Sequence, residues 1–156
     1  MRAFALLLAA ALAGCQSGGQ IQSAGHSAST TTLTAQITSQ LNRAAADWNR
    51  GDLEGFLSDY AADSNTTFID GYRSRRGIDF IRRNYAPRFA AGARRDTLHF
   101  EEITARHLSP ALALVTARFI LMRGDTVTAS GPFTLVMEHR SAGWRILHDH
   151  SSSDPR

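Results

Sequence analysis

Apolar residues recur at intervals of three and four positions in three stretches of the chain. This period is typical of amphipathic helices, so we predict helices over residues 33–49, 53–60 and 78–89. Gly51 interrupts the pattern between the first two helices, and Asp52 is a suitable N-cap for the second one. The apolar positions of the first helix are Leu33, Ile37, Leu41, Ala44, Ala45 and Trp48.

A second pattern, rich in β-branched and aromatic residues, indicates strands. A short strand is predicted over residues 66–70, and four longer strands follow the third helix. Residues that reverse the chain easily separate the long strands, so consecutive strands should pair as an antiparallel meander. The long strands are predicted over residues 96–107, 111–122, 126–139 and 144–151. Helices followed by a meander indicate an α+β fold.

The length of these strands affects the shape of the sheet. Strands usually have about five or six residues, and longer strands in a small sheet must coil, bend or bulge. Proline cannot donate a hydrogen bond to a neighbouring strand, so the Gly131–Pro132 dipeptide is the expected bend, at an edge or a bulge. A sheet that curls against helices in this way encloses a pocket.

The N-terminus is organised differently from the rest of the chain. Arg2 precedes an uncharged apolar stretch that is too short to cross a bilayer as a stable helix, which indicates a signal peptide over residues 1–14. Residues 15–32 consist of small and polar residues without charge, so we predict a flexible tether there. The folded domain is expected over residues 33–156.

The end of the predicted signal peptide, Leu12-Ala13-Gly14-Cys15, resembles the lipobox of bacterial lipoproteins. In those proteins the cysteine is acylated and becomes the first mature residue. The next residue here is Gln16 rather than the aspartate that commonly retains lipoproteins in the inner membrane. The resemblance therefore implies a lipid-anchored protein of the bacterial cell envelope, at the outer membrane and facing the periplasm. An exported protein is not expected to bind nucleic acid.

The sequence contains no glycine-rich phosphate loop and no cluster of cysteines and histidines at metal-ligand spacing. We therefore expect neither a metal nor another cofactor. All 17 basic side chains are arginines, and eight of them fall between residues 73 and 95, where Asp79 is the only acid. This segment could bind an anionic lipid, a cell-wall polymer or an anionic substrate, or it could be a solvated surface.

Four short motifs occur in an order and spacing that resemble the SnoaL-like, or ketosteroid-isomerase-like, branch of the nuclear-transport-factor-like superfamily. The motifs are Trp48–Phe56, Tyr60–Asp63, Arg76–Ile78 and Gly143–Ser151. The resemblance covers residues 33–153. It implies a cone-shaped roll, in which a strongly curved antiparallel sheet wraps around three N-terminal helices and leaves a pocket at its open end. It also implies a possible homodimer through the sheet.

The catalytic residues of ketosteroid isomerases do not carry over. An ungapped count puts Ala44 at the position of the oxyanion-binding tyrosine and Phe68 at that of the general-base aspartate. Alanine cannot donate the required hydrogen bond, and the nearest carboxylate is Asp70, two residues further along the strand. The known isomerase mechanism is therefore not expected here.

Strict alternation in the last strand would place His148 and His150 on the same face as Trp144 and Ile146. This face is the more apolar one, so we expect it to line the pocket. Imidazoles titrate near neutral pH, which makes the two histidines candidate acid and base groups together with Asp70; the alternative is that they are structural caps. The candidate ligand-binding residues are Trp48, Tyr60, Arg118 and Trp144.

Three functional hypotheses remain open at this point. The first is a lipid-anchored envelope protein that binds a small, partly apolar molecule in its pocket. The second is a cofactor-independent acid–base enzyme of the isomerase, dehydratase, cyclase or hydrolase type. The third is an association domain that dimerises through its sheet. A fold shared by so many activities does not choose among them.

The lipobox leads to a testable prediction. Replacing Cys15→Ser removes the acylated thiol, so the protein should leave the membrane fraction or keep its signal peptide, and labelling with a fatty-acid analogue should disappear. The Ser17→Ala variant is the control and should be labelled and fractionate as the wild type does. Undiminished labelling of Cys15→Ser would refute the lipid anchor.

Overall fold

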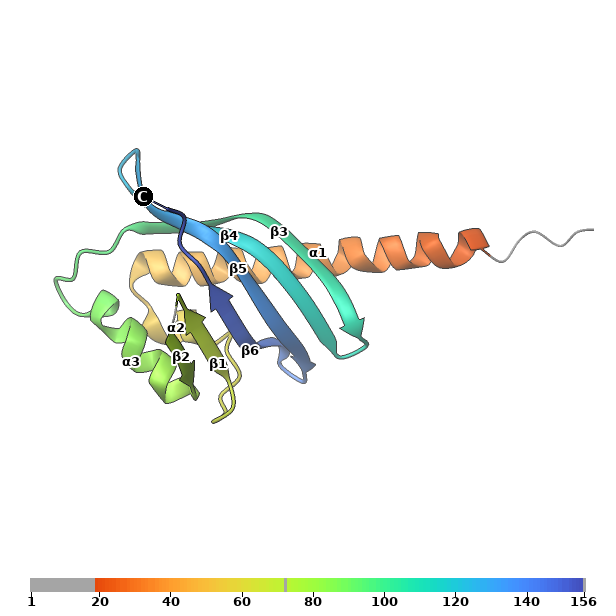
Figure 1. Cartoon of the computed structure of the whole chain (residues 1–156), viewed down its shortest axis with the longest axis horizontal. Helices are drawn as coiled ribbons and strands as arrows, with labels where there is room; N and C mark the ends of the chain where they lie inside the picture. The colour runs from red at the N-terminus through yellow and green to blue at the C-terminus, as the bar shows by residue number, and fades with distance from the viewer. Residues whose placement is uncertain (1–18, 72, 156) are drawn as a thin grey trace, which may run out of the picture.

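The computed structural model of the protein describes residues 19–71 and 73–155, with side chains from Ser29 onwards. The predicted signal peptide and Cys15 lie outside these residues. Within the described part, the chain forms three helices and six strands. Figure 1 shows the long first helix against the sheet, with the two shorter helices grouped near one end.

The helices are α1 (Gly19–Arg50), α2 (Leu53–Leu57) and α3 (Ile78–Phe89). The prediction for α3 is confirmed, and α2 is shorter than predicted. The first helix starts well before Leu33, so residues 19–32, predicted as a tether, are helical in the structure and extend beyond the sheet (Figure 1). This segment contains no proline, and adding turns to an existing helix is far easier than starting one.

The strands form one sheet in the order β2-β1-β6-β5-β4-β3. The predicted meander is confirmed, because β3 (Thr97–Ser109), β4 (Leu112–Arg123), β5 (Thr126–Arg140) and β6 (Gly143–Ser151) pair antiparallel in succession. The short strand β1 (Thr67–Asp70) runs parallel to β6. The strand β2 (Arg73–Arg76), which pairs with β1, was not predicted, because its polar sequence shows no apolar alternation.

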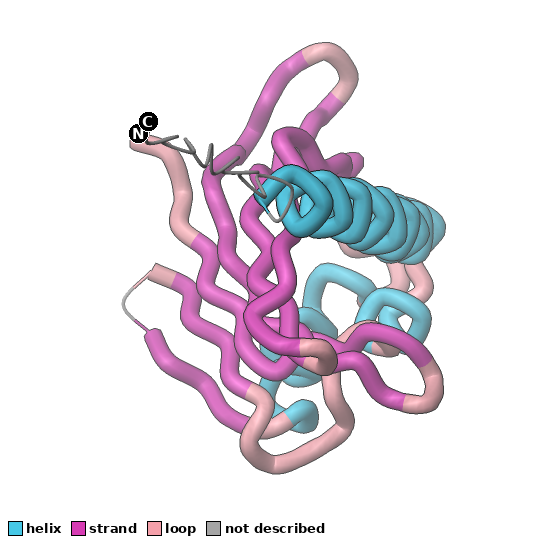
Figure 2. The backbone as a smooth tube through the Cα atoms, turned by 90° about the vertical axis from the view of Figure 1, so that its right-hand side faces the viewer, coloured by secondary structure: helices cyan, strands magenta, loops and turns pink. Residues whose placement is uncertain are grey.

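The sheet is strongly curved, and all helices lie on its concave side (Figure 2). The register shifts between Glu101 and Thr104 in β3, where Glu102 has a φ of 54°. It shifts again where β5 pairs with β6. Gly131–Pro132 does not form a bulge, because the β4–β5 register is continuous there. The dipeptide lies at an edge, the other predicted location, because the pairing of β5 with β6 ends at Phe133. The C-terminal tail lies beside it, and the Ser152 N–H donates to the Pro132 carbonyl (3.0 Å).

The core between the helices and the sheet contains a cluster of aromatic rings. Both tryptophans, Trp48 and Trp144, are buried. Trp48 of α1 makes edge contacts with Phe56 of α2 (5.3 Å between centroids) and Phe89 of α3 (5.1 Å). Each such pair contributes about 0.5–1.5 kcal/mol beyond simple burial. The cluster therefore holds the three helices together above the sheet.

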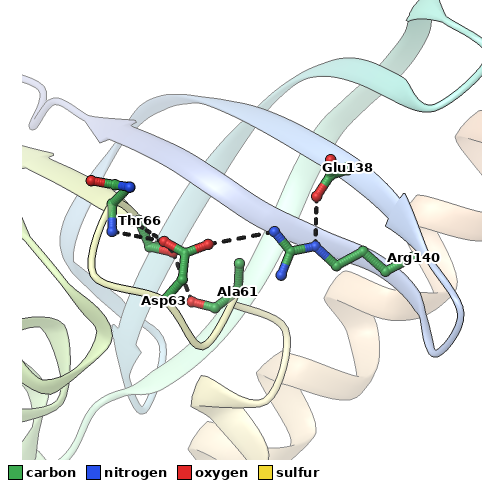
Figure 3. A network of polar contacts seen from close by, with 6 residues as sticks. Ala61, Asp63, Thr66, Glu138 and Arg140 are labelled. Atoms are coloured by element: carbon green, nitrogen blue, oxygen red, sulfur yellow. Dashed lines mark hydrogen bonds and ion pairs between the residues drawn. The ribbon is translucent and has the colours of Figure 1, made fainter.

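The loop between α2 and β1 is fixed by Asp63, as Figure 3 shows. One carboxylate oxygen of Asp63 accepts hydrogen bonds from the backbone N–H groups of Asn65 (2.7 Å) and Thr66 (2.9 Å). The other accepts from the Arg140 guanidinium at the end of β5 (3.4 Å). These bonds, the one from Asn65 first, lower the pKa of Asp63. The start of β1 is thereby fixed relative to the sheet.

The tail contact at Gly131 predicts the effect of a substitution. A Cβ atom at Gly131 would lie 1.9 Å from the Ser152 carbonyl oxygen, so Gly131→Ala must displace the tail. We expect a loss of about 1–3 kcal/mol in the free energy of unfolding, measured by urea denaturation. Val127→Ala, at an exposed position of the same strand, should change it by less than about 1 kcal/mol. Equal effects of the two substitutions would contradict this account.

Candidate functional site

A cavity of about 200 Å³ lies between the three helices and the concave face of the sheet. Its wall is mainly apolar and includes eight aromatic side chains: Trp48, Phe56, Tyr60, Phe68, Tyr85, Phe100, Phe119 and Phe133. Ligand pockets for drug-sized molecules have about 300–1,000 Å³, so this cavity suits a smaller molecule. The exposed lining residues Asp70, Arg88 and Ser153 mark its mouth, and the buried Tyr60 and Ile146 mark its closed end.

An extra residue in β6 determines which of its side chains enter the cavity. Ile146 pairs with Met137 of β5, but the next pair joins His148 to Val136, so Leu147 has no partner of its own. Such a bulge reverses the alternation of all residues that follow it. Asp149 is consequently buried on the concave side, where it lines the cavity.

The same bulge overturns the alternation predicted for the two histidines. His148 and His150 lie on the opposite face of the sheet, and neither lines the cavity. The Nδ1 atom of His148 is 2.6 Å from the Thr67 hydroxyl, and burial, followed by the charge of His150, lowers the pKa of His148. His150 is exposed. The catalytic role predicted for these histidines required a place in the cavity that they do not occupy.

Asp149 is the centre of a buried polar cluster. The Tyr60 hydroxyl donates to its Oδ2 atom (2.6 Å), and the Ser151 hydroxyl donates to its Oδ1 atom (3.0 Å). Burial disfavours the charged carboxylate and raises the pKa of Asp149 to about 6, although both hydrogen bonds act in the opposite direction. The carboxyl group can therefore gain or lose a proton near neutral pH.

Two phenols, of the buried Tyr60 and the half-buried Tyr85, share this part of the cavity. Desolvation, and after it the negative charge of Asp149, raises the pKa of both phenols. Both hydroxyl groups therefore stay protonated at neutral pH and can donate hydrogen bonds. Tyr60 is held beside β6 by backbone bonds on either side of it: the Ala61 N–H donates to the Ile146 carbonyl (2.9 Å), and the Ile146 N–H donates to the Asp59 carbonyl (2.7 Å).

Asp70, a residue that the sequence analysis selected, lines the mouth of the cavity. Asp70 pairs with Ser151 where β1 runs parallel to β6, two residues after the Phe68–Asp149 pair. The two carboxylates, Asp70 and Asp149, therefore lie on the same face of adjacent strands. The negative charge of Asp70 contributes to the raised pKa of Asp149.

The predicted ligand-binding residues divide into two groups. Trp48 and Tyr60 line the cavity. Arg118 does not: it forms an ion pair with Asp154 of the C-terminal tail, on the face of β4 that points away from the helices. Trp144 is buried outside the cavity lining, and its ring makes an edge contact with His139 (5.0 Å).

Ala44 and Phe68, which stand where ketosteroid isomerases have their tyrosine and aspartate, both line the cavity. The polar groups come instead from Asp149 and Tyr85, which the sequence analysis did not select. Tyr85 fitted the apolar stripe of α3, and nothing in the sequence marked the bulge that turns Asp149 inward. Identifying Asp149 required the pairing of β6 with β5, and identifying Tyr85 required the packing of α3 over the cavity.

The described residues contain no group of three or more histidine, cysteine, aspartate or glutamate side chains placed to hold a metal ion. None of the described helices is both long and apolar enough to cross a membrane.

The buried carboxylates predict an unusual dependence of stability on pH. Burial raises the pKa of both Asp149 and Asp59 to about 6, so between about pH 4 and pH 6 the folded state binds more protons than the unfolded state. The free energy of unfolding should therefore fall as the pH rises through this range. Asp149→Asn should reduce this fall in the free energy of unfolding by roughly 2 kcal/mol. The fall that remains should come from Asp59.

The measurement is urea denaturation at a series of pH values. The amide oxygen introduced by Asp149→Asn can still accept the hydrogen bond from Tyr60, so the fold should be preserved in the variant. The exposed Asp125→Asn is the control and should leave the pH profile unchanged. A profile of Asp149→Asn that is parallel to the wild-type profile would show that Asp149 has an ordinary pKa.

A family model described as a SnoaL-like domain matches residues 37–155. No curated protein sequence matches the chain. A solved NTF-2 like protein of unknown function from Shewanella oneidensis is 30% identical, with a TM-score of 0.64 over 77% of this chain and 98% of that one.

Two more solved structures share the fold at lower identity. An NTF2-like protein of unknown function from Pseudomonas putida is 19% identical, with a TM-score of 0.63 over 78% of this chain and 87% of that one. An NTF2-like superfamily protein from Salmonella enterica is 20% identical, with a TM-score of 0.60 over 81% and 94% of the two chains. Because the family model spans most of the chain and agrees with the fold, the protein belongs to the SnoaL-like domain family of the NTF2-like superfamily.

Proposed function

We propose that this protein binds a small, partly apolar molecule in its cavity. The observation that carries the proposal is a buried carboxylate, Asp149, at the inner part of a cavity whose wall is mainly apolar; a second buried carboxylate, Asp59, also lines this cavity. Burial of a carboxylate is unfavourable, so such a group is more common at functional sites than in ordinary cores. A few polar groups in an apolar cavity are typical of small-molecule sites.

The positions of the polar groups define how a ligand would lie. Its apolar body packs against the aromatic wall. Its polar group reaches Asp149, which accepts a hydrogen bond from a ligand hydroxyl, or Tyr85, whose phenol donates to a ligand oxygen. A neutral oxygen-containing group fits this inner end of the cavity better than an anion, because Asp149 is acidic.

The proposal places this binding domain in the bacterial cell envelope. Support comes from the apolar N-terminal stretch and the lipobox-like sequence that ends at Cys15. Helix α1 begins at Gly19, only a few residues later, so a lipid on Cys15 would anchor the domain through that helix. The cavity would then be open to the periplasm, at the outer membrane.

Acid–base catalysis is a second candidate function, and the raised pKa of Asp149 favours it. A carboxyl group with a pKa of about 6 can act as a general base or acid near neutral pH. Tyr60, whose phenol bonds to it, could stabilise the carboxylate after proton transfer. The reaction would be an isomerisation, dehydration, cyclisation or hydrolysis that needs no cofactor.

Binding can be tested with two probes of equal size, phenol and toluene, by NMR titration of the labelled domain. Both should shift the signals of cavity residues. Ala44→Leu should abolish binding of both probes because its side chain grows into the cavity, whereas Ala46→Leu, on the exposed side of the same helix, should not. Asp149→Asn should weaken the binding of phenol about tenfold and that of toluene much less.

The outcomes separate cavity binding from surface binding. If Ala44→Leu and Ala46→Leu both leave the titrations unchanged, the probes bind elsewhere and the proposal fails. If Asp149→Asn weakens the binding of phenol and toluene equally, Asp149 does not contact the hydroxyl group of phenol. Thermal unfolding of each variant shows whether its fold is retained.

A further inference from the structure

Among the described residues that line the cavity, Arg88 is the only one with a positive charge, and it lies exposed at the mouth. Arg88 lies in the last turn of α3 and lines the cavity together with Asn84, one turn earlier. Its guanidinium carbon is 5.9 Å from the centre of the Tyr85 ring. This contact places the charge next to a side chain that reaches the inner polar cluster.

The Arg88 guanidinium has no carboxylate within ion-pair distance among the described residues. Other arginines of the protein do have one: Arg82 pairs with Glu54, and Arg118 pairs with Asp154. The backbone of Arg88 is held in place, since its carbonyl accepts a hydrogen bond from Arg95 (3.1 Å). The backbone of Arg88 is therefore held at the rim, and its exposed guanidinium is available to a ligand.

The charges around the mouth restrict what could pair with Arg88. Asp70 lies on the β1 side of the mouth and Asp149 lies deeper, so the interior repels an anionic group. The segment from residue 73 to residue 95 is positive, with eight arginines and a single acid, Asp79. Three of these arginines lie on β2, next to β1, and the other five lie on α3 or in the loop after it. Such a distribution attracts anions and holds them at the rim rather than inside.

We propose that the cavity takes a small amphipathic carboxylate, whose carboxylate group pairs with Arg88 while its apolar body points inward. This inference rests on the proposed binding function and names the class of ligand. A guanidinium matches the planar carboxylate with two parallel hydrogen bonds. A doubly charged phosphate would meet stronger repulsion from Asp70, so a singly charged carboxylate fits the mouth better.

A purely structural role of Arg88 leads to a different expectation. A positive charge in the last turn stabilises a helix by interacting favourably with the helix dipole. If this were its only role, Arg88→Gln would lower thermal stability slightly and change the affinity for charged and neutral ligands equally. The two roles are separated by comparing a carboxylate with its neutral ester.

The experiment uses benzoate and methyl benzoate as probes in NMR titrations at low ionic strength. The wild type should bind benzoate more tightly than the ester. Arg88→Gln should weaken the binding of benzoate about fivefold, as expected for the loss of a solvent-exposed ion pair. The affinity for the ester should not change. Arg88→Lys should keep part of the preference, and about 0.5 M salt should reduce it.

Arg83→Gln is the matched control on the same helix. Arg83 is exposed, lies outside the cavity lining and stacks over Phe80 (5.3 Å). Benzoate affinity should be retained in this variant. Equal loss in Arg83→Gln and Arg88→Gln, or equal binding of benzoate and ester by the wild type, overturns the inference. If toluene and phenol bind but benzoate does not, the inference falls and the proposed function stands; if no probe binds, both fall.

Discussion

The unpaired residue Leu147 in β6 determines the chemistry that the cavity contains. Without this bulge, the strand would continue its alternation from Ile146 and present His148 to the interior. With it, Asp149 turns inward and the histidines face outward. The carboxylate then meets Tyr60 from the corner after α2, and the buried hydrogen bond between them joins two parts of the chain that are far apart in sequence.

The bulge has an energetic consequence as well as a geometric one. A carboxylate with a pKa of about 6 lowers the stability of the folded state above that pH, in the same direction as Asp59. Proteins keep such groups more often where they serve a function. The arrangement of Asp149 with Tyr60 and Tyr85, at the closed part of an apolar cavity, is consistent with recognition of an oxygen atom on a ligand.

The cavity has two polar ends of different character. The inner end has hydroxyl groups and a carboxylate of raised pKa, while the mouth has the Arg88 charge opposite Asp70. The aromatic wall between them is shared by helices and sheet. A ligand that satisfies both ends must carry an anionic group and an apolar body, and a second oxygen would complete its contacts at the inner end.

The sequence by itself determined the order of the elements and the class of fold. The periodicity of α3 and the turns between β3 and β6 are local signals, which depend on residues close together in the chain. It also identified Asp70 and Tyr60 as residues of the cavity. The tertiary structure alone decided the face on which Asp149 lies, because a bulge arises from the match between β5 and β6 and shifts every later side chain to the other face. The same holds for Arg88, whose position at the mouth depends on how α3 packs against the curved sheet.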